Sequence, residues 1–184
     1  MARTQSKMIS LGSKAPEFLL PEVRTSDRIG LYDVLGDKAL LVMFLSKHCP
    51  YVQRIAGQIK PLSEDYIPKG IRMIGISSND PVAYPEDSPE EMAKLASELD
   101  WRFPLLFDST QEVAKAFHAA CTPDFFLFDH KGALVYRGQM DDARPHNDEP
   151  NNGHSLRSAF DAILAAQPIP APQLPSLGCS IKWK

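Results

Sequence analysis

The sequence holds few cysteines, and no two of them are close together. Its 184 residues include only Cys49, Cys121 and Cys179, and no CxxC pair occurs. An odd number of widely spaced cysteines argues against a secreted disulfide framework and against a zinc site. We therefore predict a chain without a bound metal or other cofactor.

Three further absences limit the class of protein. No stretch approaches the ~20 apolar residues of a membrane-spanning helix, and the opening segment MARTQSKMIS lacks the apolar core of a signal peptide. The formal net charge is −3, so no basic excess indicates nucleic acid as a partner. We expect a cytoplasmic protein that binds neither membranes nor nucleic acid, of unknown oligomeric state.

A buried strand that runs into a cysteine and then a helix is the most informative stretch. Residues 39–45 form an apolar run of strand length, and helical spacing follows over residues 50–66. Pro50 suits the first helical position, which places Cys49 at the N-cap. Free backbone N–H groups and the helix dipole favour a thiolate there, and Lys47 and His48 could add positive charge.

Cys49 has two interpretations. A buried core cysteine is common, but here the flanking strand and helix supply the core, and Cys49 lies in the turn between them. We therefore predict that Cys49 is a reactive residue.

The remaining pattern predicts one α/β domain with two terminal segments. We expect a flexible N-terminus over residues 1–10, a domain over 11–166 and a proline-rich C-terminal arm over 167–184. Within the domain, the expected elements are a hairpin over 15–21 and 28–31, a helical turn over 32–35, strands over 71–76, 103–107, 124–128 and 133–136, and helices capped by Ser88 and over 110–119 and 155–166.

Four segments carry a resemblance to a known family: FLSKHCPYV, SSNDPVAYPEDSPEEM, CTPDFFLFD and GCSIKW. With them, residues 10–184 resemble the thioredoxin-like superfamily, and within it the peroxiredoxin-like proteins of the alkyl hydroperoxide reductase/thiol-specific antioxidant (redoxin) family. The resemblance implies a thioredoxin-like fold, in which helices flank a central mixed sheet. It also implies an oxidoreductase with a redox-active cysteine, Cys49.

The resemblance gives Thr122 and Pro123 a place in the site. In such proteins this peptide bond is cis and faces the active cysteine across a groove, where the backbone of Thr122 would pair with an extended disulfide substrate. The alternative is an ordinary trans proline at a strand start, because cis bonds form only ~5% of X–Pro bonds in folded proteins.

The chain departs from both standard mechanisms of its relatives. Val52 stands where thioredoxins have their second cysteine, so Cys49 has no partner one turn along the helix. Val42 and Ser46 stand where peroxiredoxins have a proline and a threonine, although Ser46 still offers a hydroxyl. Arg137 is the arginine nearest to the place of the activating arginine of peroxiredoxins.

We predict thiol–disulfide exchange through Cys49, with a disulfide substrate and an external thiol reductant. The alternatives are an antioxidant thiol peroxidase that reduces hydroperoxides and a non-enzymatic binding module. Cys179 or Cys121 could resolve the oxidised Cys49, and the reach of the arm favours Cys179. Ser46, His48, Pro50, Thr122 and Pro123 are the expected supporting residues.

The polar loops offer one further possibility, a hard cation bound by oxygen ligands. Asp80, Asp87, Asp141, Asp142 and Asn79 are the candidate ligands. We interpret them instead as a solvated polar rim, and we expect no metal at His146 or His154.

Overall fold

A mixed five-stranded sheet forms the centre of the computed structural model, which describes residues 3–184. Its strand order is β6-β5-β4-β8-β9, in which β4, β5 and β6 are parallel and β8 and β9 are antiparallel to their neighbours. The bounds are β4 (Ala39–Phe44), β5 (Ile71–Ser77), β6 (Leu105–Phe107), β8 (Asp124–Asp129) and β9 (Leu134–Gly138). The predicted mixed sheet is therefore confirmed.

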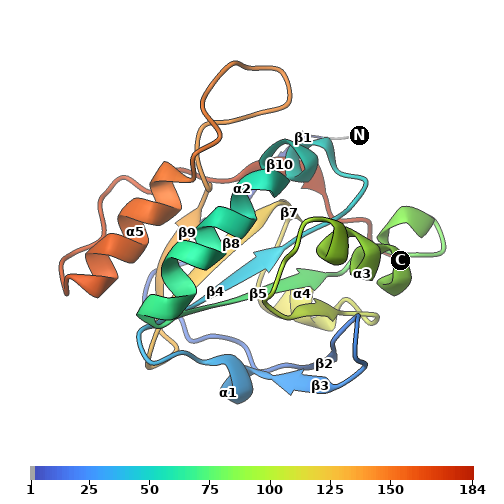
Figure 1. Ribbon diagram of the computed structural model, residues 1–184, viewed down its shortest axis with the longest axis horizontal. Helices are drawn as coiled ribbons and strands as arrows, with labels where there is room; N and C mark the ends of the chain where they lie inside the picture. The colour runs from blue at the N-terminus through green and yellow to red at the C-terminus, as the bar shows by residue number, and fades with distance from the viewer. Residues whose placement is uncertain (1–2) are drawn as a thin grey trace.

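Strand β4 is apolar throughout because both faces of the sheet are covered. Its side chains alternate: Leu41 and Met43 enter one core, and Leu40 and Val42 enter the other. The first core lies under the longer helices, as Figure 1 shows, and the second under a hairpin and two short helices. The helices of the first layer are α2 (Pro50–Tyr66), α3 (Pro89–Glu98) and α5 (His154–Leu164); the second layer holds β2 (Leu19–Pro21), β3 (Arg28–Gly30), α1 (Leu31–Val34) and α4 (Glu112–Ala116).

Two of the predicted helix starts, at Pro50 and after Ser88, are confirmed. Pro50 opens α2, and Cys49 is its N-cap residue with an extended backbone. Ser88 caps α3, and its side-chain oxygen accepts a hydrogen bond from the backbone N–H of Glu91. These local signals place the strand-to-helix turn that carries Cys49.

A second, smaller sheet was not predicted. It has the order β1-β10-β7 and joins β1 (Arg3–Gln5), β10 (Leu177–Ser180) and β7 (Cys121–Thr122), all antiparallel. The expected flexible N-terminus is thus wrong for Arg3–Gln5, because β10 offers that segment a strand edge.

The proline-rich arm lies along the main sheet before it reaches β10. The side chain of Gln173 bonds the backbone of β9 at Val135 and Arg137, and the carbonyl of Leu174 accepts a hydrogen bond from Gln139. Just before β10, Ser176 of the arm exchanges backbone and side-chain hydrogen bonds with Ser6. The arm therefore packs on the sheet and sets the position of β10 in this structure.

Candidate active site

Cys49 lies where β4, α2 and the second sheet meet. Figure 1 shows the start of α2 beside β10 and β7. The Sγ atom of Cys49 donates a hydrogen bond to the carbonyl oxygen of Thr122 at 3.0 Å. The Thr122–Pro123 peptide bond is cis, as the resemblance implies. Cys49, Thr122 and Pro123, which the sequence analysis grouped together, therefore lie together.

The expected open groove beside Cys49 is filled. Cys49 has an exposed fraction of 0%, and Cys179 one of 3%. Strand β10 fills the space because it pairs with β7, with Cys179 directly opposite Thr122. The position of Cys49 in the turn is confirmed, but the expectation that it faces an open groove is wrong.

All three thiols are free and buried, and the pKa of two of them is raised. Burial and a hydrogen-bond contact with Cys49 raise the pKa of the Cys179 thiol to about 12. Burial, with the nearby carboxyl of Asp124, raises the pKa of Cys121 still further. The Cys121 thiol is directed at the carbonyl of Pro123, at 3.5 Å. Of the two, Cys179 is the one paired with Thr122, whose carbonyl oxygen accepts the hydrogen bond from Cys49.

A fully buried carboxylate organises the loop that precedes Cys49. The side chain of Asp87 accepts hydrogen bonds from Ser46 Oγ, from the backbone N–H of Lys47 at 2.7 Å, and from Asn79 Nδ2 at 2.6 Å. His48 Nδ1 lies 2.5 Å from the same carboxylate. Two of the predicted supporting residues, Ser46 and His48, thus act on the loop through Asp87.

The polar-rim interpretation was wrong for two of the four acids. Asp87 and Asp141 are buried, and Asp141 accepts backbone hydrogen bonds from Ala143, Asn152 and Gly153. Around both carboxylates, protein N–H and O–H donors take the place of water. The polar sequence of these loops does not show which acids are buried in this way. Within residues 3–184, no three His, Cys, Asp or Glu side chains are grouped so that they could hold a metal ion.

Asp124 is a second buried carboxyl, and it was not among the residues predicted for the site. It opens β8 directly after Pro123 and accepts a hydrogen bond from the backbone N–H of Ala120. Burial raises its pKa to about 8. The available signal was an aspartate at the head of an otherwise apolar strand.

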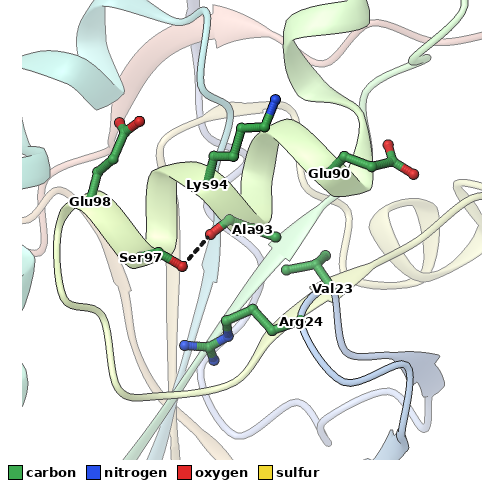
Figure 2. Close-up of a pocket in the computed structure, with 7 residues that line it drawn as sticks. All are labelled: Val23, Arg24, Glu90, Ala93, Lys94, Ser97 and Glu98. Carbon is green, nitrogen blue, oxygen red and sulfur yellow. Dashed lines mark hydrogen bonds between the residues drawn. The ribbon is translucent and has the colours of Figure 1, made fainter.

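Two other features lie away from Cys49. Arg137 is held by the side chain of Gln173 and does not enter the site. A shallow depression beside α3, shown in Figure 2, contains no cysteine. Its Arg24 side chain is occupied by Glu22 and by two backbone carbonyls, so we assign that depression no part in the chemistry.

Comparisons with known proteins agree with this geometry. The AhpC/TSA family model matches residues 11–137, so the chain belongs to that family. A solved but uncharacterised conserved protein from Geobacillus kaustophilus is 50% identical, with a TM-score of 0.98 over 100% of this chain and 97% of its own. The thioredoxin-like fold is also that of a solved thioredoxin domain of a thiol-disulfide oxidoreductase from Bacteroides vulgatus.

Two more distant relatives carry functional names. A Mycobacterium tuberculosis protein named as a peroxiredoxin is 27% identical over 63% of this chain and 68% of its own. The thiol-disulfide oxidoreductase ResA of Geobacillus kaustophilus is 24% identical over 71% and 70%. Relatives of this chain are thus named for each of the two chemistries considered above.

Proposed function

We propose that Cys49 is the reactive thiol of this thiol-dependent oxidoreductase and that it exchanges with disulfides. The observation that carries the proposal is the meeting of Cys49, Cys179 and the Thr122 carbonyl at the start of α2. A helix N-terminus stabilises a thiolate, and a second thiol at the same strand pair allows an oxidised Cys49 to be resolved internally.

The proposed cycle has three steps. The Cys49 thiolate attacks a disulfide R–S–S–R′, forms Cys49–S–S–R and releases R′–S⁻. The Cys179 thiolate then attacks the Cys49 sulfur, releases R–S⁻ and leaves a Cys49–Cys179 disulfide. An external thiol reductant finally supplies two electrons and two protons, which restores both thiols.

Peroxide reduction is the second candidate, supported by the peroxiredoxin-like resemblance. The local geometry favours it less. The hydroxyl of Ser46, which stands where peroxiredoxins have threonine, donates to Asp87. Val42, which stands where they have proline, is packed in the second core. The features that would orient a peroxide are therefore absent or already occupied.

The cellular location stays a proposal. In the part of the chain that the structure describes, no helix is both long enough and apolar enough to cross a membrane. We infer a cytoplasmic location from the sequence alone.

The assignment of Cys49 is tested by disulfide-reduction kinetics. Reduction of hydroxyethyl disulfide, with an excess thiol reductant, is measured for the wild type, Cys49→Ser and Cys121→Ser. We expect at least a hundredfold loss for Cys49→Ser and little change for Cys121→Ser, since Cys121 has no step in the cycle. Full activity of Cys49→Ser would overturn the proposal.

A further inference from the structure

Strand β10 occupies the strand edge at which an extended segment could reach Cys49. Cys179 pairs with Thr122 and Ser180 with Cys121, and the Cys49 thiol beside this pairing is fully buried. The pairing with β7 is short, since β7 has only two residues; β10 is also paired with β1 on its other edge, over three residues. A short pairing of this kind can open locally without unfolding the domain.

Gly178 fits this edge because it has no side chain. A Cβ atom on Gly178 would come within 2.1 Å of the Thr122 carbonyl oxygen and 2.6 Å of its carbon. Those are backbone atoms, so no rotation of a side chain could relieve the overlap. A strand that pairs with β7 in this way therefore needs glycine at the position immediately before the cysteine that lies opposite Thr122.

The buried side-chain amides of Asn79 and Gln111 hold the end of the chain beyond β10. The backbone N–H of Lys182 donates to Asn79 Oδ1 at 2.8 Å, and its carbonyl accepts from Gln111 Nε2, also at 2.8 Å. Gln111 Oε1 accepts from the backbone of Lys184. These are sequence-independent contacts with backbone groups, which any extended chain could reproduce.

We propose that β10 is an internal occupant of a polypeptide-binding edge, and that an extended partner segment with the order Gly-Cys takes its place when it leaves. The inference rests on the proposed function and names its substrate class. A partner cysteine in the place of Cys179 would present its disulfide sulfur to Cys49. The Cys49 thiolate attacks that sulfur, and the other half of the partner's disulfide leaves as a thiolate.

The return of β10 then completes the reaction. It displaces the partner segment from β7 and brings the Cys179 thiol against the Cys49 mixed disulfide. Attack by the Cys179 thiolate on the Cys49 sulfur releases the partner as a thiolate and leaves the Cys49–Cys179 disulfide. The external thiol reductant of the cycle then regenerates both thiols.

The gating part of the proposal is tested with Gly178→Ala. Its matched control is Gly57→Ala in α2, where an added Cβ meets no atom within 4 Å. Alkylation of Cys49 by iodoacetamide is followed by mass spectrometry in the reduced full-length proteins. We expect at least a tenfold faster reaction for Gly178→Ala and an unchanged rate for Gly57→Ala. Equal rates in all three proteins would overturn the proposal.

A second variant decides the matter if Gly178→Ala does not fold. Gln111→Asn shortens the side chain whose amide holds Lys182 and Lys184. It leaves the residues of β7 and β10 and Cys49 unchanged. It should also accelerate the alkylation of Cys49. An unchanged rate in a folded Gln111→Asn protein would count against a displaceable β10.

The specificity part uses two synthetic peptides, each supplied as its disulfide-linked dimer. One is LGCSIK, which copies residues 177–182, and the other is LACSIK. With Gly178→Ala protein, the LGCSIK dimer should form the mixed disulfide with Cys49 at least tenfold faster. Equal rates for the two dimers, with hydroxyethyl disulfide still reacting, would overturn this inference alone. If none of the three disulfides reacts with Cys49, the proposed function itself fails.

Discussion

The carboxylate of Asp87 and the Nδ1 atom of His48 lie 2.5 Å apart, immediately before the residue that caps α2. His48 also stacks on Tyr84, with ring centroids 5.0 Å apart. Its backbone N–H and that of Lys47 both donate to the same carboxylate. The Asp87 side chain, 41 residues after Ser46 in the sequence, thus fixes the path of residues 46–48, which lead into Cys49.

Removing that carboxylate should destabilise the fold. In Asp87→Ala, several buried donors lose their acceptor, and each unsatisfied group costs ~1–3 kcal/mol. We expect the free energy of unfolding to fall by at least about 3 kcal/mol, measured by urea denaturation. The neighbouring Glu86 is exposed, so Glu86→Ala should change it by less than about 0.5 kcal/mol. Similar losses in both variants would contradict the role assigned to Asp87.

The raised pKa of Asp124 leads us to expect a specific dependence of the free energy of unfolding on pH. Its folded pKa is raised by burial to about 8, whereas an unfolded aspartate titrates near ~3.9. Between these values the folded protein keeps a proton that the unfolded chain releases. Stability is therefore highest below the unfolded pKa, and falls by up to about 1.4 kcal/mol per pH unit until pH passes the folded pKa.

Asp124→Asn should remove that slope and stabilise the protein at pH 8, because the amide is neutral at every pH. Urea denaturation at a series of pH values between 4 and 8 measures the effect. Asp148 is exposed, and Asp148→Asn provides the matched control, which should keep the wild-type slope. A slope that persists in Asp124→Asn would assign the pH dependence to other groups.

The main sheet and its helices could be predicted because their signals are local. The apolar run before Cys49, the Ser88 cap and the turn after Asp129 each specify structure within a few residues. The smaller sheet could not be predicted in this way. It joins residues 3–5, 121–122 and 177–180, and strands of two to four residues carry no measurable period.

Part of the site could be predicted because its signals are also local in the sequence. Cys49 and Pro123 stand out by their position beside apolar runs and by resemblance. The burial of Asp87 could not be predicted, since it depends on donors about 40 residues away in sequence. The closure of the site by Cys179 depends on the pairing of β10 with β7, which is a tertiary contact.

Peroxide should react slowly with Cys49. The Ser46 hydroxyl is occupied by Asp87, and β10 covers the thiol. Stopped-flow oxidation of the reduced protein by hydrogen peroxide, compared with a free cysteine at equal thiolate concentration, measures the rate. We expect no acceleration over the free thiol in the wild type or in Gly178→Ala. An acceleration of a hundredfold or more would make peroxide reduction the preferred function.

The resolving step should accelerate as pH rises. In the reduced protein, burial first and then the neighbouring Cys49 raise the pKa of Cys179 to about 12. Burial remains in the mixed disulfide, so the pKa should stay raised and the thiolate fraction should grow about tenfold per pH unit well below it. A protein carrying the Cys49 mixed disulfide with mercaptoethanol should therefore close to Cys49–Cys179 roughly tenfold faster at pH 8 than at pH 7. Acid quenching and non-reducing peptide mapping would follow it.

Two serine variants assign the partner in that reaction. In Cys179→Ser the mixed disulfide should persist, because the thiol opposite Thr122 is gone and Cys121 is directed at the Pro123 carbonyl. In Cys121→Ser the closure rate should match the wild type, since Cys179 keeps its place opposite Thr122. A linked Cys49–Cys121 peptide would transfer the resolving role to Cys121. A mixed disulfide that is equally stable in all three proteins would mean that Cys49 works alone and that the external thiol resolves it directly.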